Sequence, residues 1–146
     1  MRILKTALIC VIFLLIYEDG FSQALTTLDS LKTIFWSHPS QQTNLELLYE
    51  IGSNELEPDS AAKYSNLLLE EAIRKADDKY VQRANHLLGA VYRLRGDYEK
   101  SLEFYFKSVN LAAKLEDFNA SAMSNIEIGN VYSKNGFPVI RIKKRT

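Results

Sequence analysis

One segment of the chain recurs after 40 residues. Residues 84–96 read ANHLLGAVYRLRG, and residues 124–136 read SNIEIGNVYSKNG. Five aligned positions are identical: Asn85/Asn125, Gly89/Gly129, Val91/Val131, Tyr92/Tyr132 and Gly96/Gly136. A weaker copy, LYEIG, ends at Gly52, 37 residues before Gly89. A fixed period of this length is typical of proteins built from stacked structural units, in which each unit buries its apolar face on its neighbours.

Each unit is predicted to contain two helices. Apolar residues at helical spacing predict an amphipathic helix over 98–113, with this buried face: Leu102, Tyr105, Phe106, Val109, Ala112 and Ala113. Pro58 is predicted to begin the second helix of the first unit, because proline suits the first helical position. The buried face expected there is Ala61, Ala62, Leu68, Leu69, Ala72 and Ile73. Residues after 24 show no strand-like alternation, so the predicted fold class is all-α.

Short turns separate the expected helices. Gly96 is predicted to end one helix in the left-handed conformation, and Asp97 is predicted to cap the next. The pairs Asp77-Asp78 and Glu116-Asp117 fall between units, where a carboxylate can cap the helix that follows.

Residues 84–108 resemble a tetratricopeptide repeat. Leu88, Gly89 and Tyr92 stand at its first-helix positions, residues 96–98 form its turn, and its second-helix small, aromatic and small positions hold Ser101, Tyr105 and Ser108. The 40-residue spacing resembles the longer variety in bacterial signalling and transcription-regulator arrays. The resemblance implies a helical-hairpin solenoid with a right-handed superhelix and about two and a half repeats. The expected organisation is a helix and linker at 25–42, repeat 1 at 43–78, repeat 2 at 79–118 and the first helix of repeat 3 at 119–136.

The N-terminus predicts export. Arg2 and Lys5 precede an uncharged apolar run, TALICVIFLLIY, which is shorter than the roughly 20 residues of a membrane span. Residues 1–24 are therefore expected to be a signal peptide, cleaved before Gln23 or Leu25, and the product to be periplasmic or secreted. The alternative is an uncleaved membrane anchor. Cleavage removes Cys10, the sole cysteine, so the mature chain uses neither disulfides nor a cysteine nucleophile.

The third unit departs from the repeat at Pro138, and residues 137–146 form a basic tail. The tail is interpreted as solvated or as the remnant of a truncated or frame-altered longer array. An anchor on an anionic surface is the alternative. The first helix of this unit is expected to lack a covering partner over Ala122, Ile126, Val131 and Tyr132. Self-association through this end is therefore a hypothesis.

The sequence carries no recognisable catalytic or cofactor motif. Its only histidines are His38 and His86, and its glycines lack the spacing of a phosphate-binding loop. Equal numbers of basic and acidic residues, 18 each, remove the simplest argument for nucleic-acid binding. The chain is therefore expected not to be an enzyme and to need no metal or cofactor. It is also expected to have no membrane span beyond the N-terminal segment.

Protein or peptide binding is the more natural activity. In tetratricopeptide arrays the first helices line a concave groove, and by that register the resemblance implies these groove residues: Tyr49, Ser53, Arg83, His86, Ala90, Arg93, Met123, Ile126, Asn130 and Ser133. Arg83, His86 and Arg93 share a helical face that could take an acidic peptide or a C-terminal carboxylate. The alternative is two solvated arginines and a partly packed histidine. Four aromatic residues are expected in the core: Tyr92, Tyr98, Tyr105 and Tyr132.

Three functions are weighed on these grounds. The first is an exported, non-enzymatic repeat scaffold that binds a protein or peptide. The second is a truncated extracytoplasmic region of a bacterial signalling protein, of the sensor-kinase or transcription-regulator type. The third is an unrecognised hydrolase, for which no residues can be named.

Overall fold

The computed structural model describes residues 27–134, and all of its regular elements are helices. Residues up to Gln42 and residues from Thr43 form two compact units. The described part of the first unit holds a helix at 27–37 and the 3-10 helix η1 (Pro39–Gln41). The second unit contains α2 (Leu45–Asn54), α3 (Pro58–Arg74), α4 (Asp78–Leu94), α5 (Tyr98–Lys114) and α6 (Phe118–Lys134). The expected signal peptide at 1–24 and the basic tail at 137–146 lie outside the described residues.

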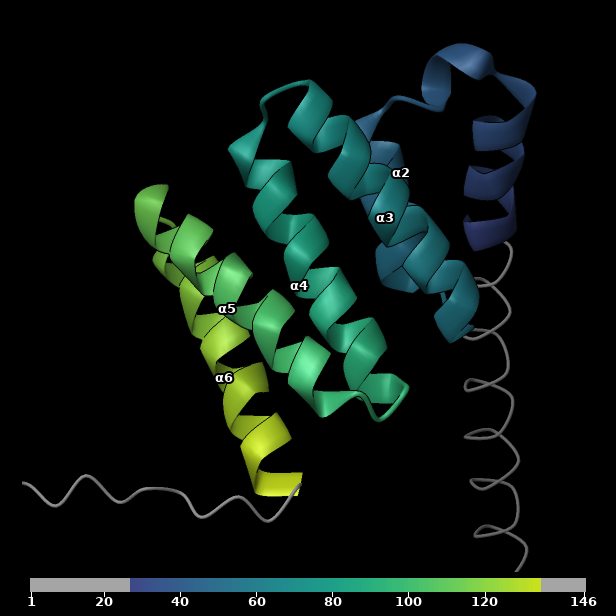
Figure 1. Cartoon of the computed structure of the whole chain (residues 1–146). Coiled ribbons are helices and arrows are strands. Elements are labelled where there is room, and N and C mark those ends of the chain that lie inside the picture. Colours follow the sequence, from purple (N-terminus) through teal and green to yellow (C-terminus); the bar gives the residue numbers. More distant parts are fainter. Residues whose placement is uncertain (1–26, 135–146) are drawn as a thin grey trace, which may run out of the picture. The chain divides into compact units, whose positions relative to one another are not determined.

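Within the second unit, each helix packs mainly against its neighbours in sequence (Figure 1). Weaker contacts join alternate helices, α2 with α4 and α4 with α6. Helices α3 to α6 are each 17 residues long, and α5 and α6 begin 40 residues after α3 and α4. The prediction of an all-α fold is confirmed for the described residues, and their arrangement is compatible with a helical-hairpin solenoid.

The turns repeat more often than the hairpins do, every 20 residues. Ala76, Gly96 and Glu116 follow α3, α4 and α5 and adopt left-handed φ angles of 53°, 78° and 56°. After each comes an aspartate whose amide bonds back five residues: Asp77 N to Ala72 O, Asp97 N to Tyr92 O and Asp117 N to Ala112 O. Each aspartate then accepts from the amide three residues ahead and caps the next helix. The expected roles of Gly96, Asp97 and the inter-unit carboxylates are confirmed.

The closest helix approach in this unit is between α4 and α5 at Gly89. A Cβ atom added to Gly89 would lie 2.6 Å from the Tyr105 ring, whose side chain is fully buried. Ser101 Oγ donates a hydrogen bond of 2.8 Å to the Gly89 carbonyl oxygen. The glycine therefore removes the one side chain that would hold the two helices apart.

The buried face of α5 differs from the predicted one. Ser101, Tyr105, Ser108 and Ala112 are buried, whereas Phe106 and Ala113 are exposed. Leu102 and Val109 are half-buried at the edges of this face. The reason is that α5 lies between α4 and α6, so its contact line takes small residues and moves bulky ones to the margins. The small, aromatic and small positions of the repeat signature mark the buried line better than hydrophobicity does.

Three further burial predictions are corrected. Ile73 is 62% exposed and Leu69 is half-buried, because both lie at the edge of α3 beside a surface hollow shared with α4 and α5. Among the four aromatic residues expected in the core, only Tyr105 is buried; Tyr92, Tyr98 and Tyr132 are half-buried at its rim. Val131, expected to be uncovered, is buried against Tyr105 of the preceding helix. Ala122 and Ile126 are exposed, as expected.

The left-handed turns predict an asymmetric response to glycine. Glu116→Gly should stabilise the chain by about 1 kcal/mol, because the left-handed conformation is unfavourable for a residue with a Cβ and not for glycine. Glu103→Gly, in the interior of α5, should destabilise by about 1 kcal/mol because glycine is a poor helix former. Urea unfolding followed by circular dichroism measures both. Equal destabilisation by the two substitutions would contradict the assigned turn.

The two glycines of the repeat should respond oppositely to alanine. Gly89→Ala forces its Cβ into the Tyr105 ring and should destabilise by roughly 1–3 kcal/mol. A Cβ atom at Gly129 would have no atom within 4 Å, so Gly129→Ala should stabilise by up to about 1 kcal/mol through helix propensity. The same unfolding measurement compares them. Destabilisation by Gly129→Ala would show that this position is packed in solution.

Candidate functional site

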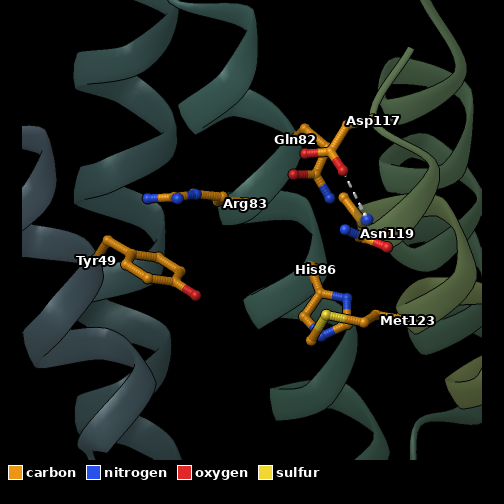
Figure 2. Close-up of a pocket in the computed structure, with 8 residues that line it drawn as sticks. Tyr49, Gln82, Arg83, His86, Asp117, Asn119 and Met123 are labelled. Carbon is orange, nitrogen blue, oxygen red and sulfur yellow. Dashed lines mark hydrogen bonds between the residues drawn. The ribbon is translucent and has the colours of Figure 1, made fainter. Parts of the chain in front are cut away.

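A pocket of about 260 Å³ opens where three alternate helices of the second unit meet (Figure 2). Tyr49 comes from α2, and Gln82, Arg83 and His86 come from the first half of α4. The turn before α6 and the first turns of that helix supply the remaining lining residues: Asp117, Asn119, Ala120 and Met123. The pocket therefore depends on the stacking of successive hairpins and does not exist within any one of them.

The wall nearest α2 is built around Arg83. Its guanidinium carbon lies 4.6 Å from the centroid of the Tyr49 ring and 5.1 Å from that of Tyr80. Arg83 Nη1 is also 3.6 Å from Glu46 Oε2. Contact with two ring faces and a carboxylate restrains the cation at this wall. Its charge is thus already partly compensated within the chain.

Glu46 also accepts a hydrogen bond from the Tyr80 hydroxyl. This bond is the main cause that raises the pKa of Tyr80 to about 12, since ionising the hydroxyl would remove the donor and place two negative charges together. Tyr80 therefore stays protonated at neutral pH and holds the Glu46 carboxylate beside Arg83.

The floor of the pocket is a chain of buried polar groups. Gln82 Nε2 donates to Ser108 Oγ at 2.7 Å, Ser108 Oγ lies 2.8 Å from Ser124 Oγ, and Ser124 Oγ lies 2.9 Å from His86 Nδ1. Ser108 and Ser124 are fully buried, and Gln82 is nearly so. These bonds connect α4, α5 and α6 through side chains alone.

Counting donors fixes the direction of this chain. The Gln82 amide nitrogen can only donate, so Ser108 accepts from it and has its own hydrogen to give to Ser124. Ser124 then gives its hydrogen to His86 Nδ1, which must be unprotonated. The imidazole is accordingly neutral, with its hydrogen on Nε2 at the pocket lining.

The environment of His86 agrees with a neutral ring. Burial lowers the pKa of His86, and the negative charge of Glu127 opposes this only in part. The edge of the ring also packs against Tyr105, with 5.5 Å between centroids. Protonation at Nδ1 would reverse the bond to Ser124 and leave one serine hydrogen without a partner in a buried site.

On the α6 side, Asp117 accepts a 2.9 Å hydrogen bond from the Ala120 amide, which is the N-terminal cap of the helix (dashed in Figure 2). Asn119 and Met123 are exposed at the rim, and Met123 is 58% exposed. A carboxylate, an amide and a thioether thus face Arg83 and His86 across the opening (Figure 2).

The structure brings together part of the groove set expected from sequence. Tyr49, Arg83, His86 and Met123 line the pocket. The remaining groove residues are not among its lining residues: Ser53, Ala90, Arg93, Ile126, Asn130 and Ser133.

Two of those outside the pocket are occupied elsewhere. Ser53 Oγ donates to the Glu50 carbonyl oxygen, and Arg93 Nε lies 3.3 Å from Glu127 Oε2. Arg83 and Arg93 each have a carboxylate partner and are only 28% and 24% exposed as side chains. The pocket therefore presents one compensated arginine rather than two free ones.

Sequence reasoning missed four lining residues: Gln82, Asp117, Asn119 and Ala120. Gln82 is one position before Arg83 and lies on the α4 face that meets α5, which the groove register passes over. Asp117 could have been found from the 20-residue spacing of Asp77, Asp97 and Asp117. Nothing in the sequence marks Asn119 and Ala120, whose position follows from how α6 stacks on α4.

No family model, curated protein or solved structure matches this chain. Within residues 27–134, no three His, Cys, Asp or Glu side chains are gathered so that they could hold a metal ion. None of the helices in that range combines the length and apolar character needed to cross a membrane.

The depressed pKa of His86 predicts a pH-dependent stability. A group whose pKa is lower when folded contributes stability that is present above its unfolded value of 6.5 and lost as the pH falls through the folded value. Asparagine can offer Ser124 an acceptor at the Nδ1 position without titrating. Wild type should therefore lose stability relative to His86→Asn as the pH falls from 7 to 5, with no such divergence between pH 7 and 8.

Urea unfolding of both proteins at half-unit pH steps makes this measurement. All other titrating groups, including His38, are common to the two chains and cancel in the difference. A difference that stays constant from pH 5 to 8 would contradict a buried, neutral His86.

Proposed function

We propose that this chain is a non-enzymatic, tetratricopeptide-type repeat scaffold whose pocket binds one side chain of a protein or peptide partner. The observation that supports it is the pocket itself, to which α2, α4 and α6 each contribute residues. A surface lined by alternate helices is where stacked helical hairpins present an extended binding face.

The size of the pocket favours a peptide side chain over a free small molecule. Its volume of about 260 Å³ lies below the roughly 300–1,000 Å³ of pockets that enclose drug-sized ligands. Its lining mixes an aromatic ring and a thioether with hydrogen-bonding groups of both kinds. A partner side chain with an apolar body and a polar end fits this lining, and neighbouring residues of the partner would rest on the rim.

The one pair that resembles a catalytic couple argues for structure rather than chemistry. Ser124 Oγ and His86 Nδ1 are 2.9 Å apart, a separation typical of a nucleophile and its base. Ser124 is fully buried and also bonded to Ser108, so a substrate cannot reach its hydroxyl without opening the α5–α6 contact. We therefore assign the pair to the pocket floor.

Export is part of the same proposal and rests on the sequence pattern of residues 1–24, which lie outside the described residues. The alternative role, as the extracytoplasmic repeat region of a signalling protein, would use the same pocket to sense a peptide or protein. No contact in the described residues favours this alternative over an independent scaffold.

The binding proposal is tested by filling the pocket. Peptides selected from a displayed random library on the purified chain are measured by fluorescence anisotropy against wild type and Ala120→Trp. Ala120 is a half-buried lining residue, so the indole should occupy the pocket and weaken selected peptides at least tenfold.

Ala113→Trp is the matched control, because Ala113 is exposed on α5 and does not line the pocket. Its affinity for the same peptides should equal that of wild type. Peptides that bind Ala120→Trp and wild type equally would remove the pocket from the function, and a library that yields no binder would contradict peptide binding.

A further inference from the structure

The face of α4 that receives α5 is defined by four residues at helical spacing: Gln82, Asn85, His86 and Gly89. Three of them contact α5 directly. Gln82 donates to Ser108, the His86 ring packs on Tyr105, and Gly89 lies against the Tyr105 ring. Asn85 is only 4% exposed. This face is thus a helix-docking surface that is filled within the chain.

The 40-residue repeat places a second copy of that surface on α6. Its counterparts are Ala122, Asn125, Ile126 and Gly129, which we call the α6 docking face. All four are exposed, and Ile126 is 63% exposed. Within the described residues, no helix covers them, and α6 is flanked by α5 on one side only (Figure 1).

The glycines make the comparison quantitative. A Cβ on Gly52 would lie 3.3 Å from Ser65 Oγ of α3, and one on Gly89 would lie 2.6 Å from Tyr105 of α5. At Gly129 the same atom meets nothing within 4 Å. The first two glycines each admit the helix that follows, and the third holds the same space open.

The α6 docking face is also preorganised like its counterpart. Asn85 Nδ2 donates to the Val81 carbonyl oxygen four residues earlier, and Asn125 Nδ2 donates to the Ser121 carbonyl oxygen in the same way. The amide is therefore held against its own helix in both faces. A docking helix would find the α6 face already in the conformation that α4 has when covered.

We propose that the α6 docking face binds an amphipathic helix of a partner polypeptide that carries serine four residues before an aromatic residue. The chain shows why this pattern is required. Ser101 Oγ donates to the Gly89 carbonyl oxygen and Tyr105, four residues later, covers the glycine. The Gly129 carbonyl can accept the same second bond, because a carbonyl oxygen has two lone pairs.

One difference between the faces sets the partner apart from α5. Gln82, whose amide bonds Ser108, is replaced by Ala122, and His86 is replaced by Ile126. The residue of the partner that corresponds to Ser108 would face apolar groups and have no donor to accept from. It should therefore be a small apolar residue such as alanine rather than serine.

The probe for this site is a synthetic peptide of residues 97–115, the chain's own α5, with a hydrocarbon staple between positions 99 and 103. Both positions are exposed on α5, so the staple enforces the helix without touching the docking line. The peptide is titrated by fluorescence anisotropy into the purified full chain. Binding should strengthen with Ser108→Ala in the peptide and weaken at least tenfold with Tyr105→Ala.

Variants of the full chain locate the binding. Gly129→Leu should weaken the stapled peptide at least tenfold, because the leucine side chain fills the space meant for the aromatic ring. Asn130→Leu is the matched control, exposed on the same helix but outside the docking face, and should bind like wild type. Unfolding curves check that both variants remain folded.

Three outcomes would overturn the proposal. Equal binding by Gly129→Leu and wild type would mean that the peptide displaces α5 from α4 instead. Peptide binding that appears only after deletion of residues 135–146 would make those residues the occupant. Dimerisation of the chain that Gly129→Leu abolishes, without peptide binding, would make a second copy the occupant. The pocket of the proposed function is unchanged in Gly129→Leu, so the two proposals fail independently.

Discussion

The contact between Gly89 and Tyr105 is the interaction on which the second unit depends. It allows α4 and α5 to approach until a serine hydroxyl reaches the Gly89 carbonyl, and the same approach brings Gln82 and His86 within reach of the α5 side chains. A longer separation would break the polar chain that forms the pocket floor. The pocket and the packing therefore share one geometric cause.

Small residues at the centre of the helix contacts explain why polar side chains are so prominent in this interior. Ser101, Ser108 and Ser124 are completely buried, and two of them belong to the chain that ends at His86. Closely spaced helices have no room for large apolar groups along their contact line. Serine fits this space, and its hydroxyl is satisfied by a neighbour across the interface.

The turns were largely predictable, because their chemistry is local. Gly96, Asp97 and Pro58 have the roles that their residue types favour. The full 20-residue rhythm was hidden because Ala76 and Glu116 take a left-handed conformation that their side chains disfavour. Their position is fixed by the aspartate that follows and by the helices on either side rather than by intrinsic preference.

The sequence by itself determined the helical class, the 40-residue unit and pocket residues such as Tyr49, Arg83 and His86. These follow from spacing along one chain, which helix geometry converts directly into faces. Only the tertiary structure decided that Arg93 pairs with Glu127, that Phe106 faces solvent and that Asp117 and Ala120 complete the pocket. These depend on the distance and angle between helices, which are set by side chains from different repeats and have no signature within any one of them.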